Sequence, residues 1–286
     1  MSSEPKISPR TYLPVALSLT LTWILTLLSK QARLTYPRPA ITPLQEPAPT
    51  APPSQALTSP GPYLNALIVI GLIAISGVVV LYIARKRPRL FRLLTGTLIW
   101  LISFGITVIY VLNLALAFDL ALLRLWMPIS ILAASIITYV IYWRGEIAAA
   151  LASSYIASGA GGAIGMSIPY WTFLTLVAGI SIYDVFAVYK GHLSTLSKDE
   201  ALSLKGLTVE VGDVVIGLGD LFFYSLTVSA ILWNLGFLPA LAATAAVLAG
   251  FSIILLSLRR KRMIPGLPIP LLASVVLAFF VKLLFQ

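Results

Sequence analysis

The chain has no cysteine and a single histidine, His192, among its 286 residues. Disulfide bridges, a cysteine nucleophile and cysteine-ligated metals are therefore excluded, and so is a cluster of histidine ligands. Charged residues are also scarce, at 10% of the chain, whereas a soluble domain carries about 25%. The side chains that most soluble enzymes use for catalysis or metal binding are largely missing.

Hydrophobic residues are abundant instead, at 59% of the chain, with a mean hydropathy of +0.96. They gather into runs close to the ~20 residues that a membrane-spanning helix needs. These values predict an all-α polytopic membrane protein with nine transmembrane helices, in which the spans themselves form the core. The predicted spans are residues 13–28, 64–83, 93–118, 122–143, 147–165, 171–189, 214–235, 238–258 and 269–285.

The first run, Leu13 to Leu28, follows Lys6 and Arg10 and resembles a signal peptide. The segment after it, Ser29 to Ala32, makes a poor cleavage site, so we expect a retained first helix. If the N-terminus is cytoplasmic, fifteen of the twenty lysines and arginines face the cytoplasm. The positive-inside rule then predicts a cytoplasmic N-terminus and an outward-facing C-terminus. The net charge of +10 is thereby explained by topology and anionic lipid headgroups, without a nucleic-acid partner.

Proline is concentrated between Thr35 and Pro62, which holds nine of the nineteen prolines and few large apolar residues. This composition predicts an extended, mobile linker after the first span. We therefore expect three parts: residues 1–62 with the first helix and the linker, residues 63–165 as a helical scaffold, and residues 166–286 as the catalytic helices.

Two aspartates, Asp184 and Asp220, lie inside consecutive apolar runs. Inserting an ionisable group into the hydrocarbon core of a bilayer costs at least a few kcal/mol, so we expect such a residue to have a functional role. Asp184 is five residues before the end of its run, and Asp220 is six residues after the start of the next. Because consecutive spans are antiparallel, both carboxylates are expected roughly 8–9 Å inside the same, cytoplasmic boundary.

Two carboxyl groups brought within a few ångströms share one proton, so that one activates a water molecule as general base while the other donates a proton to a carbonyl oxygen. Gly217 and Gly219 remove side-chain bulk beside Asp220, and Gly217 is expected on the same helical face. The plainer interpretation is close helix packing beside an incidentally buried acid.

Two further segments are predicted on the cytoplasmic side. Thr208, Val209 and Val211 belong to an alternating segment that suits a short exposed strand, which could pair with an unwound substrate by strand addition. An amphipathic loop remains an alternative. Prolines 265, 268 and 270 predict irregular backbone before the last span, at a depth where such backbone must be buried in protein or line a wet cavity. An ordinary helix start with proline in its first turn is the alternative.

Tyr183-Asp184, Gly217-Leu218-Gly219-Asp220 and Pro265-Gly266-Leu267-Pro268 together resemble the motifs of the presenilin and signal peptide peptidase family of intramembrane aspartyl proteases. The resemblance implies that Asp184 and Asp220 are the catalytic pair. Gly266 departs from the alanine that is usual in the family. The resemblance also implies two sets of substrate-binding residues. Tyr183, Gly217 and Gly219 would shape the site, and Pro265, Gly266, Leu267 and Pro268 would form the loop that positions the substrate.

The expected function is hydrolysis of transmembrane helical substrates by a two-aspartate mechanism, with no cofactor and no metal. The charge bias matches the presenilin orientation, and compact, cysteine-free loops favour a microbial member in the cell membrane. The expected partners are the lipid bilayer and transmembrane substrates, with a homo-oligomer left open. One alternative is a cation or proton conductor that uses the same paired acids as relay groups. Another is a non-catalytic membrane scaffold.

Overall fold

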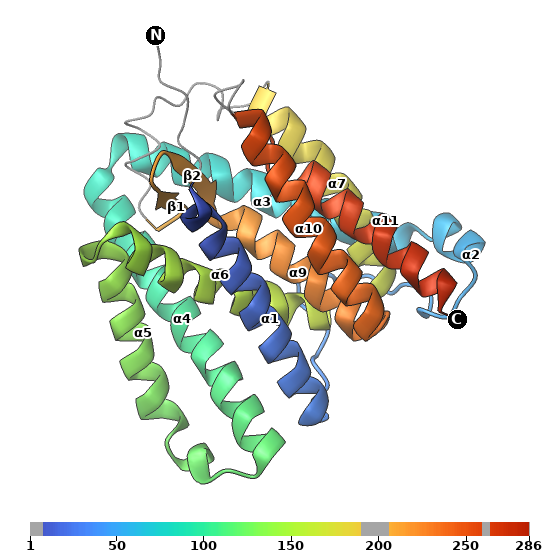
Figure 1. Ribbon diagram of the computed structural model, residues 1–286, viewed down its shortest axis with the longest axis horizontal. Helices are drawn as coiled ribbons and strands as arrows, with labels where there is room; N and C mark the ends of the chain where they lie inside the picture. The colour runs from blue at the N-terminus through green and yellow to red at the C-terminus, as the bar shows by residue number, and fades with distance from the viewer. Residues whose placement is uncertain (1–7, 190–205, 259–263, 286) are drawn as a thin grey trace. The chain divides into compact units, whose positions relative to one another are not determined.

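The computed structural model describes residues 8–189, 206–258 and 264–285. The regular secondary structure of this described part is helical apart from one small β-hairpin (Figure 1). Nine of its helices have 17 residues or more: α1 (Leu13–Gln31), α3 (Pro60–Lys86), α4 (Pro88–Phe118), α5 (Trp126–Trp143), α6 (Glu146–Ser167), α7 (Tyr170–Tyr189), α9 (Leu218–Asn234), α10 (Phe237–Leu258) and α11 (Pro268–Leu284). The shorter elements are η1 (Pro9–Tyr12), α2 (Pro53–Thr58), η2 (Ala121–Arg124), β1 (Thr208–Val211) and β2 (Val214–Gly217).

Proline explains where several helices begin. Pro60, Pro88 and Pro268 are the first residues of α3, α4 and α11. The first N–H of a helix has no partner within it, so proline loses nothing there, and its fixed φ suits the helix. Pro88 in addition separates α4 from α3, which ends two residues earlier at Lys86.

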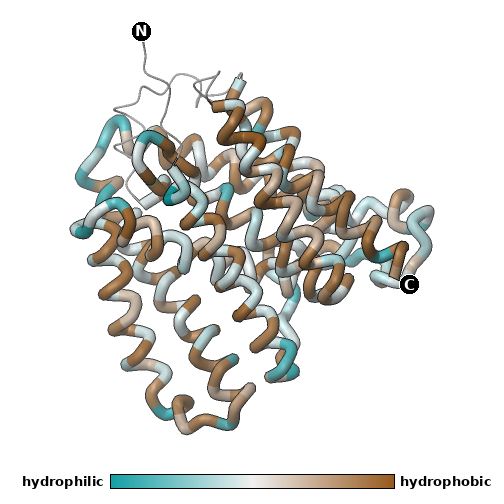
Figure 2. The backbone as a smooth tube through the Cα atoms, viewed as in Figure 1, coloured by the Kyte–Doolittle hydropathy of each residue, from teal (hydrophilic) through white to brown (hydrophobic). Residues whose placement is uncertain are grey.

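Hydrophobic residues, brown in Figure 2, recur along the helices, with paler and more polar residues between them. Among the described residues, seven helices are long and apolar enough to cross a membrane, while α9 and α11 have 17 residues each. Large apolar side chains such as Leu98, Leu132 and Val276 are more than half exposed, as expected of residues that face lipid. The prediction of an all-α, multi-pass integral membrane protein is therefore confirmed, whereas the count of nine spans and the orientation stay predictions.

The chain divides into two compact units. The first comprises Met1–Thr35, Ile83–Ala163 and Leu196–Leu226, and the second comprises Tyr36–Tyr82, Ile164–Thr195 and Thr227–Gln286. Each unit thus combines segments that are distant in the sequence. The three-part functional division stays a prediction.

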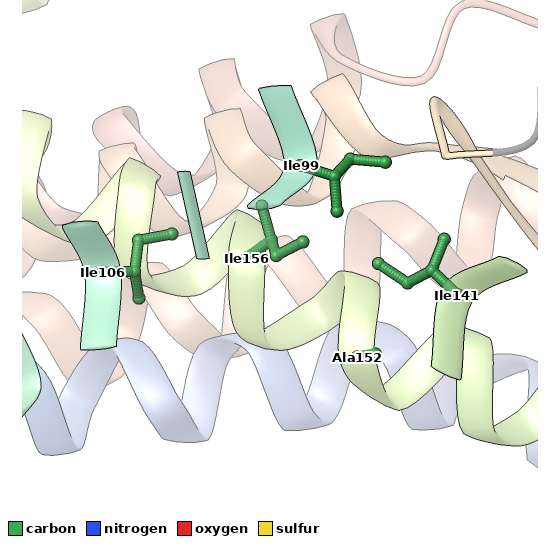
Figure 3. Close-up of a cluster of buried hydrophobic side chains, with 5 residues drawn as sticks. All are labelled: Ile99, Ile106, Ile141, Ala152 and Ile156. Carbon is green, nitrogen blue, oxygen red and sulfur yellow. The ribbon is translucent and has the colours of Figure 1, made fainter. Parts of the chain in front are cut away.

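The first unit has a core where α4, α5 and α6 meet. Ile99 and Ile106 of α4, Ile141 of α5, and Ala152 and Ile156 of α6 form one buried cluster (Figure 3). On α6, the residue that faces Ile106 is a glycine at position 159, where an added Cβ would overlap the isoleucine. The absence of a side chain therefore lets α6 approach α4 closely.

The second unit is built on a similar close approach between α10 and α11. A Cβ added at Gly250 would lie 2.7 Å from the Cα atom of Pro270, so the two backbones pack directly against each other. Helix α7 packs against α11. A Cβ at Gly179 of α7 would lie 2.6 Å from Cδ1 of Ile70 on α3. Glycines thus allow α10 to approach α11 and α7 to approach α3 within this unit.

The prediction of a mobile linker between Thr35 and Pro62 was wrong. Asn65 of α3 accepts a hydrogen bond from the Leu44 N–H and donates one to the Leu44 carbonyl, both 2.9 Å long. The Pro62 carbonyl accepts a hydrogen bond of 3.0 Å from Oγ1 of Thr175 on α7. Proline removes backbone donors and prevents regular helix, but its carbonyl remains an acceptor for tertiary contacts. The segment is therefore fixed to α3 and α7.

Candidate active site

Asp184 lies near the end of α7, five residues before its last residue, Tyr189, as predicted. Its side chain is partly buried. One carboxylate oxygen, Oδ2, accepts a hydrogen bond of 2.9 Å from the backbone N–H of Leu267. The backbone of Gly266 is a second hydrogen-bond partner of the same carboxyl group. Two motifs that are more than eighty residues apart in the chain are thus brought together within the second unit.

The Pro265–Leu267 segment has irregular backbone, and α11 begins directly after it at Pro268. Pro265 is buried and Leu267 is only 5% exposed. Irregular backbone inside a membrane protein needs protein partners for its polar groups. Here the Asp184 carboxylate is the hydrogen-bond partner of the Gly266 and Leu267 backbone. Tyr183, which precedes Asp184 on α7, is also partly buried.

Asp220 is the third residue of α9 and lies in its first turn. The prediction that residues 214–235 form one helical span was wrong at its start, because Val214–Gly217 is strand β2. Asp220 is therefore not six residues into a helix, and its depth cannot be derived from helical rise alone. Asp220 belongs to the first unit and Asp184 to the second.

The strand predicted at Thr208–Val211 is present as β1, paired antiparallel with β2. In the register, Val209 opposes Ile216 and Val211 opposes Val214. These four side chains are buried, whereas Glu210 and Val215 lie on the more exposed face. The chain turns through two residues, Gly212 with a φ of +60° and Asp213, as suits a tight hairpin.

In the part of the chain that the structure describes, the sheet has only these two strands. Thr208 opposes Gly217 at the end of the hairpin that leads into α9. The Leu218 N–H continues the pairing by donating to the Leu207 carbonyl over 2.9 Å. The hairpin therefore ends three residues before Asp220, and β1 keeps one edge that no described strand pairs with.

Gly217 lies beside Asp220, although the predicted reason, a shared helical face, was wrong. A Cβ added at Gly217 would lie 3.5 Å from Oδ2, 3.6 Å from Cγ and 3.8 Å from Oδ1 of Asp220. The carboxylate thus bends back over the end of β2, where only a glycine leaves it uncovered. Gly219 is exposed, and a Cβ there would meet no described atom within 4 Å.

On the expectation that Asp220 is one of a catalytic pair, a Gly217→Ala variant should fold normally but lose about tenfold in cleavage rate, since a methyl group against the carboxylate would obstruct the approach of water and substrate. The contact distances are ordinary van der Waals distances, so no clash is expected. The rate per folded molecule is the quantity to measure. A matched control is Gly105→Ala on α4, where the added methyl group meets no described atom. A rate equal to that of the control would contradict the role of Gly217.

Sequence analysis missed the second strand of the hairpin. Its signal was present, since Gly212-Asp213 separates two short apolar segments as two-residue hairpin turns do. Among the described residues, no three histidine, aspartate or glutamate side chains gather as a metal-binding group would.

Comparison with known proteins gives three findings. The family model described as signal-peptide peptidase, presenilin aspartyl protease matches residues 42–205, which include Asp184 but end before Asp220. Presenilin-B of Dictyostelium discoideum is 33% identical over 121 residues, which are 38% of this chain and 25% of that protein. The chain thus matches about a quarter of the length of this relative.

Two solved structures, each described as a presenilin family intramembrane aspartate protease, share the fold. One has a TM-score of 0.64 at 19% identity and covers 97% of this chain and 100% of its own. The other has a TM-score of 0.65 at 21% identity and covers 96% of both chains. The fold match extends over nearly the whole chain, and the family model matches more than half of it. The chain therefore belongs to the signal peptide peptidase and presenilin family of aspartyl proteases.

Proposed function

We propose that the chain is an intramembrane aspartyl endopeptidase that hydrolyses peptide bonds of transmembrane helical substrates, with Asp184 and Asp220 as its catalytic pair. The observation that supports this most directly is the hydrogen bond from the Leu267 N–H to the Asp184 carboxylate. It joins the Tyr-Asp motif to the Pro-x-Leu-Pro motif. A proline-rich loop beside a carboxylate suits a site where an extended substrate backbone must lie next to a catalytic acid.

In the proposed mechanism, the two carboxyl groups share one proton and act on one water molecule. The ionised carboxylate removes a proton from water, whose oxygen attacks the scissile carbonyl carbon, while the protonated partner donates to the carbonyl oxygen. The tetrahedral diol intermediate collapses when the C–N bond breaks: the amine nitrogen takes the proton from one carboxyl group, and a hydroxyl group of the diol returns its proton to the other carboxylate as the carbonyl re-forms. The pair again holds one proton at the end, so neither a metal ion nor a covalent intermediate is needed.

The substrate helix must unwind first, because helical hydrogen bonds occupy its carbonyl groups. The edge of β1 that no described strand pairs with offers backbone groups to an unwound segment. Val209 and Val211 point their side chains into the protein, so they support the strand, while its backbone would make the substrate contact. The Pro265–Pro268 segment would hold the substrate on the side of Asp184.

We further propose nine membrane spans with a cytoplasmic N-terminus, an outward C-terminus and the catalytic acids near the cytoplasmic side. The nine long helices of the described residues coincide with the nine apolar runs, and fifteen of twenty basic residues favour this orientation. The site residues come from the catalytic helices, residues 166–286, of a protein in the cell membrane of a microbe. A homo-oligomer is compatible with this assignment.

The test is cleavage of a single-span substrate by the purified protein in liposomes. We expect two product fragments, produced at a rate that a transition-state-mimicking aspartyl protease inhibitor reduces by at least about tenfold. Product masses locate the cut within the substrate's membrane span. An intact substrate combined with proton or cation flux across the same liposomes would overturn the proposal and support the conductor instead.

A further inference from the structure

The start of α7, the helix that carries Asp184, has no capping side chain of its own. Helices usually begin with a serine, threonine, aspartate or asparagine that accepts the unpaired N–H groups of the first turn. Here the residue before α7 is Pro169, whose side chain has no acceptor. The N–H groups of Trp171 and Thr172 therefore need a partner from elsewhere in the chain.

Glu46 in the proline-rich segment is that partner. Its Oε1 accepts a hydrogen bond of 3.0 Å from the Trp171 N–H, and its Oε2 accepts one of 2.8 Å from the Thr172 N–H. Oε2 also accepts a hydrogen bond of 2.7 Å from Oγ1 of Thr172. A carboxylate at a helix N-terminus is favoured both by charge-assisted hydrogen bonds and by the helix dipole. Glu46 thus caps α7 from about 125 residues away in the sequence.

The backbone around Glu46 is anchored on both sides, which gives the carboxylate a fixed position. Asn65 of α3 holds Leu44 through two hydrogen bonds and donates a third, of 3.2 Å, to Oγ1 of Thr172. After Glu46, the Ala48 carbonyl accepts a hydrogen bond of 3.1 Å from Nε1 of Trp171. Asn65 and Thr172 are fully buried. Residues 44–48 therefore form a rigid connection between α3 and the first turn of α7.

We propose that Glu46 is a positioning residue that sets the height and rotation of α7 and, through the helix, the place of the Asp184 carboxyl group beside Leu267. This inference rests on the proposed function. Asp184 follows Thr172 by twelve residues, or about 18 Å of continuous helix. Because a helix transmits rotation and axial shift along its length, the cap at one end and the Leu267 N–H at the other fix α7 together.

The first test measures catalysis by Glu46→Ala, Glu46→Gln and the control Gln45→Ala, whose side chain is exposed next to Glu46. Titration with a tight-binding transition-state mimic counts the correctly folded sites, so that kcat is expressed per site. We expect Glu46→Ala to lower kcat about tenfold at unchanged KM, because small displacements of a catalytic group affect turnover more than binding. Glu46→Gln keeps one acceptor oxygen, and we expect a loss of only about threefold.

A residue that only stabilises the fold would lower the number of titrated sites and leave kcat per site unchanged, which would overturn the proposal. So would equal kcat per site for Glu46→Ala and Gln45→Ala. If Glu46→Ala does not fold, Thr172→Val replaces it, since that change removes the hydroxyl group that donates to Glu46 and accepts from Asn65 but keeps the backbone N–H bond to Glu46. An unchanged kcat per site in Thr172→Val would also contradict the proposal.

The second test does not depend on activity. Since the chain has no cysteine, a Val185→Cys, Ile269→Cys pair accepts two nitroxide labels at exposed sites on α7 and α11. Pulsed electron paramagnetic resonance then measures the distance between the two labels, and hence between α7 and α11 near Asp184. We expect the distance distribution to shift or broaden in Glu46→Ala and to stay unchanged in Gln45→Ala. An unchanged distribution in Glu46→Ala would refute the positioning role, whereas a shifted one in a protein that cleaves nothing would refute only the proposed protease.

Discussion

Replacing Asp220 with asparagine is expected to reduce cleavage of a reconstituted single-span substrate by about 10²–10⁴-fold, the range that a general acid or base contributes. Asparagine has nearly the same shape as aspartate but neither takes nor gives the proton that the proposed mechanism requires. Asp220 lies in the first turn of α9, and asparagine occupies the same space there without a change of backbone. The loss should therefore be chemical, with the fold retained.

The measurement is the initial cleavage rate in liposomes, together with helix content and elution volume of each variant. Asp213→Asn is a matched control, because it makes the same chemical change at an exposed residue of the hairpin turn, seven residues before Asp220. We expect its rate to stay within about twofold of the parent, as for most surface substitutions. Undiminished cleavage by Asp220→Asn would remove Asp220 from the catalytic pair.

The largest effect on stability is expected for Gly161→Leu, where α6 meets α9 within the first unit. A Cβ at Gly161 would overlap the Phe222 carbonyl oxygen and would lie 2.9 Å from the Ser225 Cβ and 3.0 Å from the Leu226 N. Two of these three atoms belong to the α9 backbone, which cannot move away as a flexible side chain can. Overpacking of this kind costs about 1–3 kcal/mol and occasionally more, so we expect a loss of about 3 kcal/mol.

The free energy of unfolding in detergent micelles, from a denaturant titration, tests this prediction. Gly105→Leu on α4 is the control, since its added side chain starts where no described atom lies within 4 Å. Equal stability of the two variants would show that α6 and α9 do not approach as closely as the structure indicates. Because Phe222 follows Asp220 by two residues, separation of the helices should lower cleavage as well.

The helices and the candidate acids were predictable because their signals are local. Apolar runs near 20 residues located nine helices, and prolines marked several of their starts. Asp184 was placed correctly relative to the end of α7. Asp220 was not placed correctly relative to the start of α9. Val214, Val215 and Ile216 are as apolar as the span that follows, and composition does not distinguish a buried strand from a buried helix.

The contacts that fix α7 were not predictable, since they join residues with no local signature. Glu46 stands among prolines in a segment whose composition predicts mobility, and its partners follow more than a hundred residues later. A missing cap at Pro169 was the only clue in the sequence. Likewise, the motif Pro265–Pro268 predicted irregular backbone, but only the structure shows that its Leu267 amide binds Asp184.

Helix α4 has 31 residues and α5, which packs against it, has 18. The apolar part of α4, residues 93–118, is about 39 Å long and α5 is about 27 Å long, against a hydrocarbon core about 30 Å thick. A helix longer than the bilayer tilts or thickens the lipid around it, and a shorter one thins it. The two helices therefore favour bilayers of different thickness. A change in the thickness of the host membrane would thus act on the first unit, which also carries Asp220.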